Sequence, residues 1–223
     1  MTFPDSPIFF ATLSMFFAGL NDVVFKRYST KDRSRGMYVL GIGVIWTVLQ
    51  AGTFCLKGTP FTLDSTTLLF GLSAGIFLTL SNLLLIESLT HINVSLGSTI
   101  YRLNTIGVIL LSVIFLGETI GLFKWAGIMT GICGVLLLYK KSHFHDEGRT
   151  FLLFFFVAIV ASIFRATYGV ITKGGILQQA DPDMMLLLIS SCWIIGGGFY
   201  AIGREGRFRF TRKKRSIHSF PAC

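Results

Sequence analysis

The stretch LGSTIYRLNTIGVILLSVIFLGETIGLFKWAGIMTGICGVLLLYKK, residues 96–141, is the most informative part of the chain about its fold. It contains two apolar runs, residues 96–116 and 122–139, separated by the short connection 117–121. Each run has about the 17–25 residues that a helix needs to cross the hydrocarbon core of a bilayer. Because the connection is too short for a domain, the stretch predicts two neighbouring, antiparallel membrane helices.

The composition of the whole chain also predicts an integral membrane protein. Of its 223 residues, 52% are hydrophobic and 14% are charged, whereas soluble domains have about 25% charged residues. The formal net charge of +9 comes from basic clusters outside the apolar runs. Basic proteins often bind nucleic acid, but basic clusters that flank membrane helices face anionic headgroups. We therefore expect a lipid environment and no nucleic-acid partner.

Seven apolar runs predict about seven transmembrane helices in an all-α, multi-pass bundle. They cover residues 8–25, 37–56, 67–89, 96–116, 122–139, 151–173 and 184–203. No Lys or Arg precedes the first run. A secretory signal needs a positive start, so we expect this run to be retained as a helix.

The distribution of Lys and Arg predicts the orientation of the bundle. The loop 26–36, the linker 140–150 and the tail 204–223 contain fifteen of the twenty basic residues, and all three fall on one side of the membrane. Three basic residues fall on the other side, and Arg102 and Arg165 lie inside spans. Cytoplasmic loops are enriched in Lys and Arg. The prediction is an outside N-terminus and a cytoplasmic tail.

An internal repeat emerges when the sequence is shifted by 147 residues. This shift pairs Lys26 with Lys173 and Trp46 with Trp193. Five spans precede the second copy, so it would be inverted relative to the first, as in many secondary transporters. The predicted organisation is a five-helix repeat, a linker, a partial second repeat of two helices and a basic tail, at residues 8–139, 140–150, 151–203 and 204–223. We expect either a truncated product or a chain completed by a second subunit, with a homodimer among the alternatives.

Several short motifs point to a family. They are Phe115-Leu116-Gly117-Glu118, Lys124-Trp125-x-Gly127, Gly131-x-x-Gly134 and Ile100-Tyr101-Arg102-Leu103-Asn104. Together they resemble the end of the first repeat of the EamA family, in the drug/metabolite transporter superfamily. The resemblance covers residues 8–139 well and 151–203 more loosely. It implies a ten-helix fold and a transporter that moves a small metabolite by alternating access, and we expect it in a bacterial inner membrane. Glu118 matches the recurrent Leu-Gly-Glu of the family, where its carboxylate would cap the next helix.

Polar residues inside the spans are the candidates for a solute-binding site, because polar groups are costly in hydrocarbon. Helical spacing places small or polar side chains on one face of the first, third, fourth and sixth spans. The predicted cavity residues are Asn21, Asn82, Tyr101, Arg102, Arg165 and Tyr168. Two guanidinium groups would suit an anionic or carboxylate-bearing solute.

Structural interpretations of the same residues stay open. Each arginine could instead pair with Glu87 or Asp22, or extend to the headgroups. Glu87 itself could exchange protons during a transport cycle, but the expected role is a salt bridge at the membrane boundary. The glycines in Gly71-x-x-x-Gly75 and Gly127-x-x-x-Gly131 would serve close helix packing.

The sequence contains no phosphate-binding glycine loop, no nucleophile–base pair and no metal-ligand spacing. We therefore expect no enzyme activity, no cofactor and no metal. The leading hypothesis is a secondary transporter for a small-molecule solute. The alternative is a non-transporting membrane fragment or a partner-binding subunit.

Overall fold

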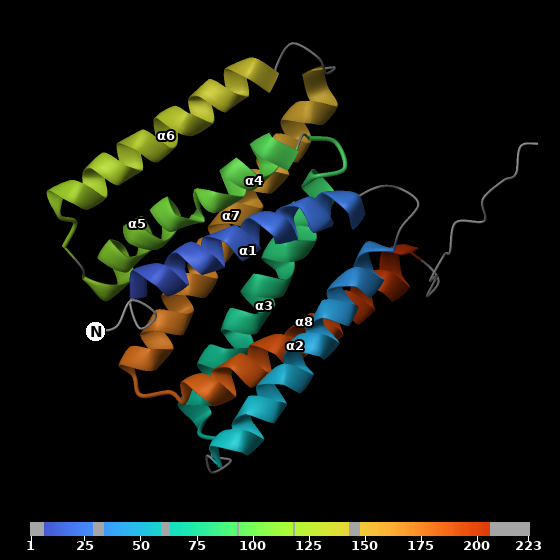
Figure 1. Ribbon diagram of the computed structural model, residues 1–223, viewed down its shortest axis with the longest axis vertical. Helices are drawn as coiled ribbons and strands as arrows, with labels where there is room; N and C mark the ends of the chain where they lie inside the picture. The colour runs from blue at the N-terminus through green and yellow to red at the C-terminus, as the bar shows by residue number, and fades with distance from the viewer. Residues whose placement is uncertain are drawn as a thin grey trace, which may run out of the picture.

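The computed structural model describes residues 7–28, 34–58, 63–92, 94–117, 119–142 and 148–205, and within these ranges it contains helices and no strand. The all-α prediction is therefore confirmed. Figure 1 shows the eight helices, which are α1 Pro7–Tyr28, α2 Arg35–Lys57, α3 Ser65–Ser88, α4 Val94–Arg102, α5 Asn104–Leu116, α6 Leu122–Ser142, α7 Gly148–Leu177 and α8 Pro182–Glu205.

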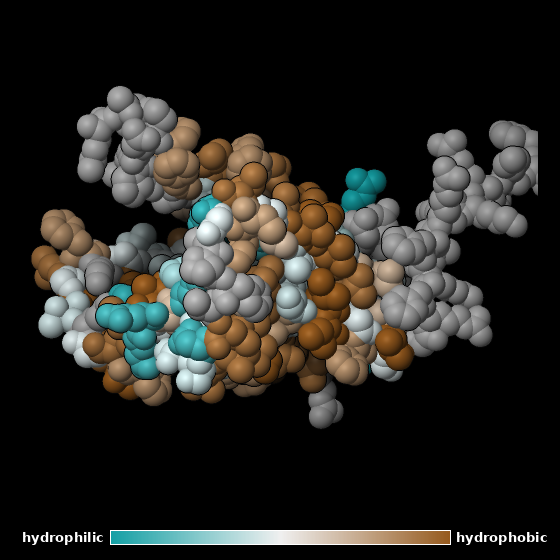
Figure 2. Space-filling view, turned by 90° about the horizontal axis from the view of Figure 1, so that it is seen from below, coloured by the Kyte–Doolittle hydropathy of each residue, from teal (hydrophilic) through white to brown (hydrophobic). Residues whose placement is uncertain are grey.

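Five helical stretches of the described chain are long and apolar enough to cross a membrane. They are Arg35–Lys57, Ser65–Ser88, Thr99–Leu116, Thr150–Leu177 and Pro182–Arg204. The two other expected spans, residues 8–25 and 122–139, coincide with α1 and α6; α6 contributes the shorter apolar helix Trp125–Gly134. Figure 2 shows hydrophobic residues over most of the described surface on one side, with hydrophilic residues in small patches. Such an exterior suits lipid, and the protein is an integral membrane protein.

The expected span 96–116 is confirmed as the candidate span Thr99–Leu116, and its helix is divided at Leu103. Helix α4 ends at Arg102 and α5 begins at Asn104. The amide of Leu103 between them donates to the carbonyls of both Thr99 and Ile100, at 3.2 and 3.0 Å. A hydrogen bond to the third preceding residue tightens the backbone into a 3₁₀ turn. The chain therefore interrupts this span without a proline.

Helices α2 and α8 form a closely packed antiparallel pair (Figure 1). A Cβ atom on Gly36 would lie 2.5 Å from the backbone nitrogen of Ala201, and one on Gly197 would lie 2.5 Å from that of Leu40. Side chains at these positions would force the backbones apart, because real Cβ atoms do not approach so closely. The pair depends on glycine at both positions.

Helix α3 occupies the centre of the bundle and packs against both α7 and α8. Its Gly71 and Gly75 lie against Leu188 and Cys192 of α8, where an added Cβ would approach to 2.7 and 2.6 Å. The predicted packing role is confirmed for these two glycines. Gly127 of α6 differs, because no described heavy atom lies within 4 Å of the Cβ it would carry.

Charged groups tie the helices together at opposite ends of the bundle. At one end, Lys26 Nζ donates to the carbonyls of Leu89 and Ile92, at 2.6 and 3.0 Å, in the segment that follows α3. At the other end, Lys57 Nζ lies 2.7 Å from a carboxylate oxygen of Asp183. The structure thus separates Lys26 from Lys57, as the charge distribution predicts.

Candidate functional site

A cavity of about 350 Å³ lies between the helices. Such a volume is at the lower end of the roughly 300–1,000 Å³ range of small-molecule sites. The residues around it come from every helix except α6 and are Ala18, Asn21, Trp46, Leu78, Asn82, Tyr101, Arg102, Asn104, Arg165, Tyr168 and Trp193. Those on α2, α3, α7 and α8 belong to the middle turns of their helices. The cavity therefore lies near the middle of the membrane-spanning bundle.

One wall of the cavity is held by a buried hydrogen-bond network. The Tyr101 hydroxyl donates to Asn82 Oδ1 at 3.2 Å, and Asn82 Nδ2 donates to the carbonyl of Leu78 at 2.7 Å. Ser81 Oγ lies 3.2 Å from the same hydroxyl and donates to the carbonyl of Ala161 at 2.7 Å. These contacts connect α3, α4 and α7. Since their polar groups already have partners, Asn82 and Tyr101 form a rigid part of the wall.

Arg165 is held differently, by aromatic rings. Its guanidinium carbon lies 5.3 Å from the ring centroid of Tyr168 and 5.8 Å from that of Tyr101. Both distances allow cation–π attraction. In the described part of the chain, this guanidinium has neither a hydrogen bond nor an ion pair. The N–H groups of this guanidinium therefore remain available to a solute in the cavity.

The lining also contains Trp46 and Trp193, whose rings meet edge to face with centroids 5.6 Å apart. The indole nitrogen of Trp193 is buried, and no described group accepts its hydrogen bond. A buried N–H group without an acceptor carries a free-energy cost. Because this nitrogen is fully buried, Trp193 contributes the aromatic surface of its ring to the cavity.

All six residues predicted from the sequence, Asn21, Asn82, Tyr101, Arg102, Arg165 and Tyr168, line this single cavity. Their role in solute binding stays a prediction. The sequence reasoning missed three side chains with chemical potential: Trp46, Trp193 and Asn104. The 147-residue shift pairs the two tryptophans, and this is the signal that could have identified them. Two other polar residues of the same span, Thr105 and Ser112, do not line the cavity: Thr105 is exposed and Ser112 is buried.

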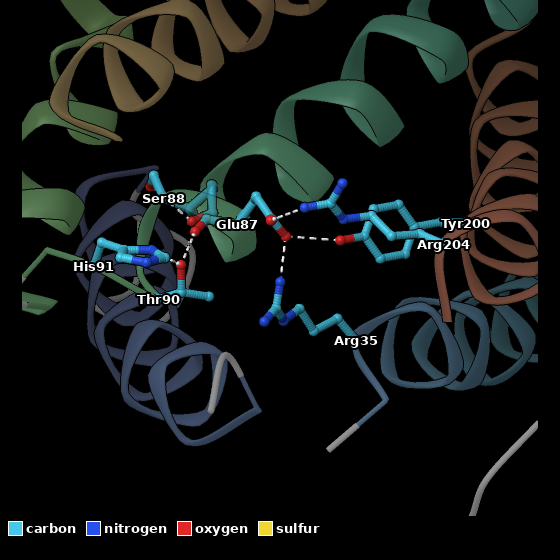
Figure 3. A network of polar contacts seen from close by, with 8 residues as sticks. Arg35, Glu87, Ser88, Thr90, His91, Tyr200 and Arg204 are labelled. Carbon is cyan, nitrogen blue, oxygen red and sulfur yellow. Dashed lines mark hydrogen bonds and ion pairs between the residues drawn. The ribbon is translucent and has the colours of Figure 1, made fainter. Parts of the chain in front are cut away.

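The expected boundary salt bridge of Glu87 is confirmed (Figure 3). Its carboxylate pairs with Arg35, accepts from Tyr200 at 2.7 Å and pairs with Arg204 at 2.8 Å. These partners belong to α2 and α8, so the alternative in which Arg165 pairs with Glu87 is wrong. Glu118 and the side chain of Asp22 lie outside the described residues.

A comparison with protein families agrees with this architecture. The model of the EamA-like transporter family matches residues 5–140, more than half of the chain. The chain belongs to the EamA-like transporter family. Among functionally curated proteins, none matches it.

The EamA match confirms the resemblance inferred from the motifs in residues 96–141. It covers most of the described structure from α1 to α6, and therefore every cavity residue from Ala18 to Asn104. Arg165, Tyr168 and Trp193 lie after the matched region. The transporter-like character of the chain thus comes from its EamA part, while α7 and α8 complete the cavity.

Proposed function

We propose that this EamA family member is a secondary transporter that moves a small metabolite across a bacterial inner membrane by alternating access. The observation that carries the proposal is the cavity at mid-depth, which is lined by polar residues and to which seven of the described helices contribute. Secondary transporters bind solute near the bilayer midplane, where fixed polar groups replace its hydration. Intramembrane arginines are costly and mark solute pathways. Transport of this kind needs no catalytic residues.

The interruption between α4 and α5 supports the proposal. It lies directly at the cavity, because Arg102 ends α4, Asn104 begins α5, and both line the cavity. Transporter binding sites are commonly formed by discontinuous membrane helices, whose ends bring backbone dipoles and polar side chains to the solute. The α4–α5 break would serve this purpose here.

Alternating access also needs two units that can rock against each other. We propose that residues 8–139 and 151–203 are inverted copies, joined by the linker 140–150. Gly43 packs on Ile194, and the Thr47 hydroxyl donates to Ser190 at 3.0 Å. Under the 147-residue shift, Gly43 corresponds to Ser190 and Thr47 to Ile194, so the two contacts are images of each other.

The same symmetry accounts for the tryptophan pair. Trp46 and Trp193 are equivalent under the shift and touch each other. Equivalent residues of two copies can meet only near the axis that relates the copies. An axis through this pair would pass beside the cavity, which favours a solute site between the two units.

The test is the accessibility of a cysteine in the cavity from both sides of the membrane. The four native cysteines are replaced by serine, and Tyr168→Cys is compared with Ile114→Cys, whose native side chain is exposed on the outside of α5. A membrane-impermeant maleimide is added to either face of oriented vesicles. We expect Tyr168→Cys to react from both faces and Ile114→Cys from neither.

Reaction of Tyr168→Cys from one face alone would mean that the cavity is closed at its other end. That result would contradict alternating access. It would favour the alternative of a non-transporting membrane subunit.

A further inference from the structure

The Arg165 guanidinium and the aromatic lining of the cavity indicate a class of solute. We propose that the cavity binds a small organic carboxylate with an apolar body, and this proposal rests on the transporter function above. The proposal is supported by the charge of the cavity, its available donors and its aromatic surface.

The described lining of the cavity is positively charged. Among the cavity residues that the structure describes, Arg102 and Arg165 are cationic, and none is acidic. An arginine remains protonated under all ordinary conditions. Placing a guanidinium at mid-depth without a carboxylate partner is costly, and Arg165 has no such partner in the described chain. A bound anion would supply the negative partner for the Arg165 guanidinium.

The available donors favour a carboxylate over a simple ion. The guanidinium of Arg165 can bind a carboxylate through two parallel N–H···O bonds. Trp193 lines the same cavity with its ring, while its indole N–H is buried in the wall.

The rest of the lining favours an apolar body on the solute. Trp46 and Trp193 contribute large aromatic surfaces, and Ala18 and Leu78 contribute aliphatic ones. Removal of apolar surface from water favours the binding of such a body. The solute class is therefore an organic anion rather than an inorganic ion or acetate.

The experiment measures binding to the full chain in lipid nanodiscs. In a Trp125→Phe background, fluorescence reports only the two tryptophans of the cavity. The probes are cyclohexanecarboxylate, its neutral amide, cyclohexylammonium and acetate. We expect the carboxylate to bind at least tenfold more tightly than the amide and than acetate, and cyclohexylammonium not to bind.

Variants identify the groups responsible. Arg165→Gln should abolish the preference for carboxylate over amide, and Arg165→Lys should keep the preference with weaker binding, because the charge remains but the planar fork is lost. Trp193→Phe should weaken carboxylate binding severalfold. The control Arg27→Gln, at the exposed end of α1, should change nothing.

Equal affinity for carboxylate and amide, tighter binding of the ammonium, or an intact preference in Arg165→Gln would each overturn the proposal. The labelling of Tyr168→Cys is a separate measurement. Labelling from both faces without a carboxylate preference would reject this solute class and keep the transporter. A carboxylate preference with labelling from one face would reject transport and keep the anion site.

Discussion

Removal of the Glu87 carboxylate is expected to destabilise the bundle more than removal of any single partner. Glu87 of α3 binds Arg35 of α2 and both Tyr200 and Arg204 of α8. Glu87→Ala would leave all three without this acceptor. The change therefore removes the contact that joins three helices at one end of the bundle.

The magnitude follows from the exposure of each partner. The side chains of Glu87 and Arg35 are 19% and 16% exposed, whereas that of Arg204 is 66% exposed. Leaving a fully buried partner unpaired costs about 3–5 kcal/mol, and an exposed ion pair contributes at most about 1 kcal/mol. For these partly buried groups we expect Glu87→Ala to cost about 2–4 kcal/mol. Arg204→Gln should cost less than about 1 kcal/mol.

The assay is reversible unfolding of the purified protein in mixed micelles with increasing SDS. Glu87→Gln provides an intermediate case, because the amide keeps one acceptor oxygen for Tyr200 but loses the charge. The expected order of destabilisation is Glu87→Ala, then Glu87→Gln, then Arg204→Gln. Equal losses for Glu87→Ala and Arg204→Gln would refute the reasoning, since they would mean that partner burial does not set the cost.

Other variants test the helix packing and the repeat. Gly197→Ala would place a methyl group 2.5 Å from a backbone nitrogen of α2 and should cost about 1–3 kcal/mol, whereas Gly203→Ala meets no described atom within 4 Å and should leave SDS unfolding unchanged or slightly improved. Ser81→Ala removes the buried bond from α3 to α7 and should cost about 1 kcal/mol by the same measurement. Cysteines replacing Arg27 and Lys173 should react with an impermeant maleimide from opposite membrane faces, and reaction from one common face would contradict the inverted repeat.

Much of the architecture followed from residue types alone. Continuous apolar runs of about 20 residues cross a membrane as helices, because the bilayer offers no partner for backbone groups and a barrel strand is about half as long. The positions of α1, α2, α3, α6, α7 and α8 were therefore predictable. The motifs around Gly117 and Trp125 were also sufficient to indicate the EamA family.

The break at Leu103 was not predictable from the pattern, because residues 96–116 lack the proline that usually signals an interruption. Leu103 is an ordinary helix former, and only the hydrogen bonds of its amide reveal the tight turn. A hydrophobic pattern reports which face is buried but does not report small changes in backbone winding.

Residue type and order specified the membrane-spanning helices and the polar side chains inside them, because both follow from the cost of polar groups in hydrocarbon. Helix packing was needed to establish that Arg165 and Trp193 meet in one cavity while Glu87 pairs elsewhere. The difference arises because helical spacing places residues on the faces of a single helix only. Which faces meet depends on close contacts such as Gly36–Ala201, and these form only when the helices pack together.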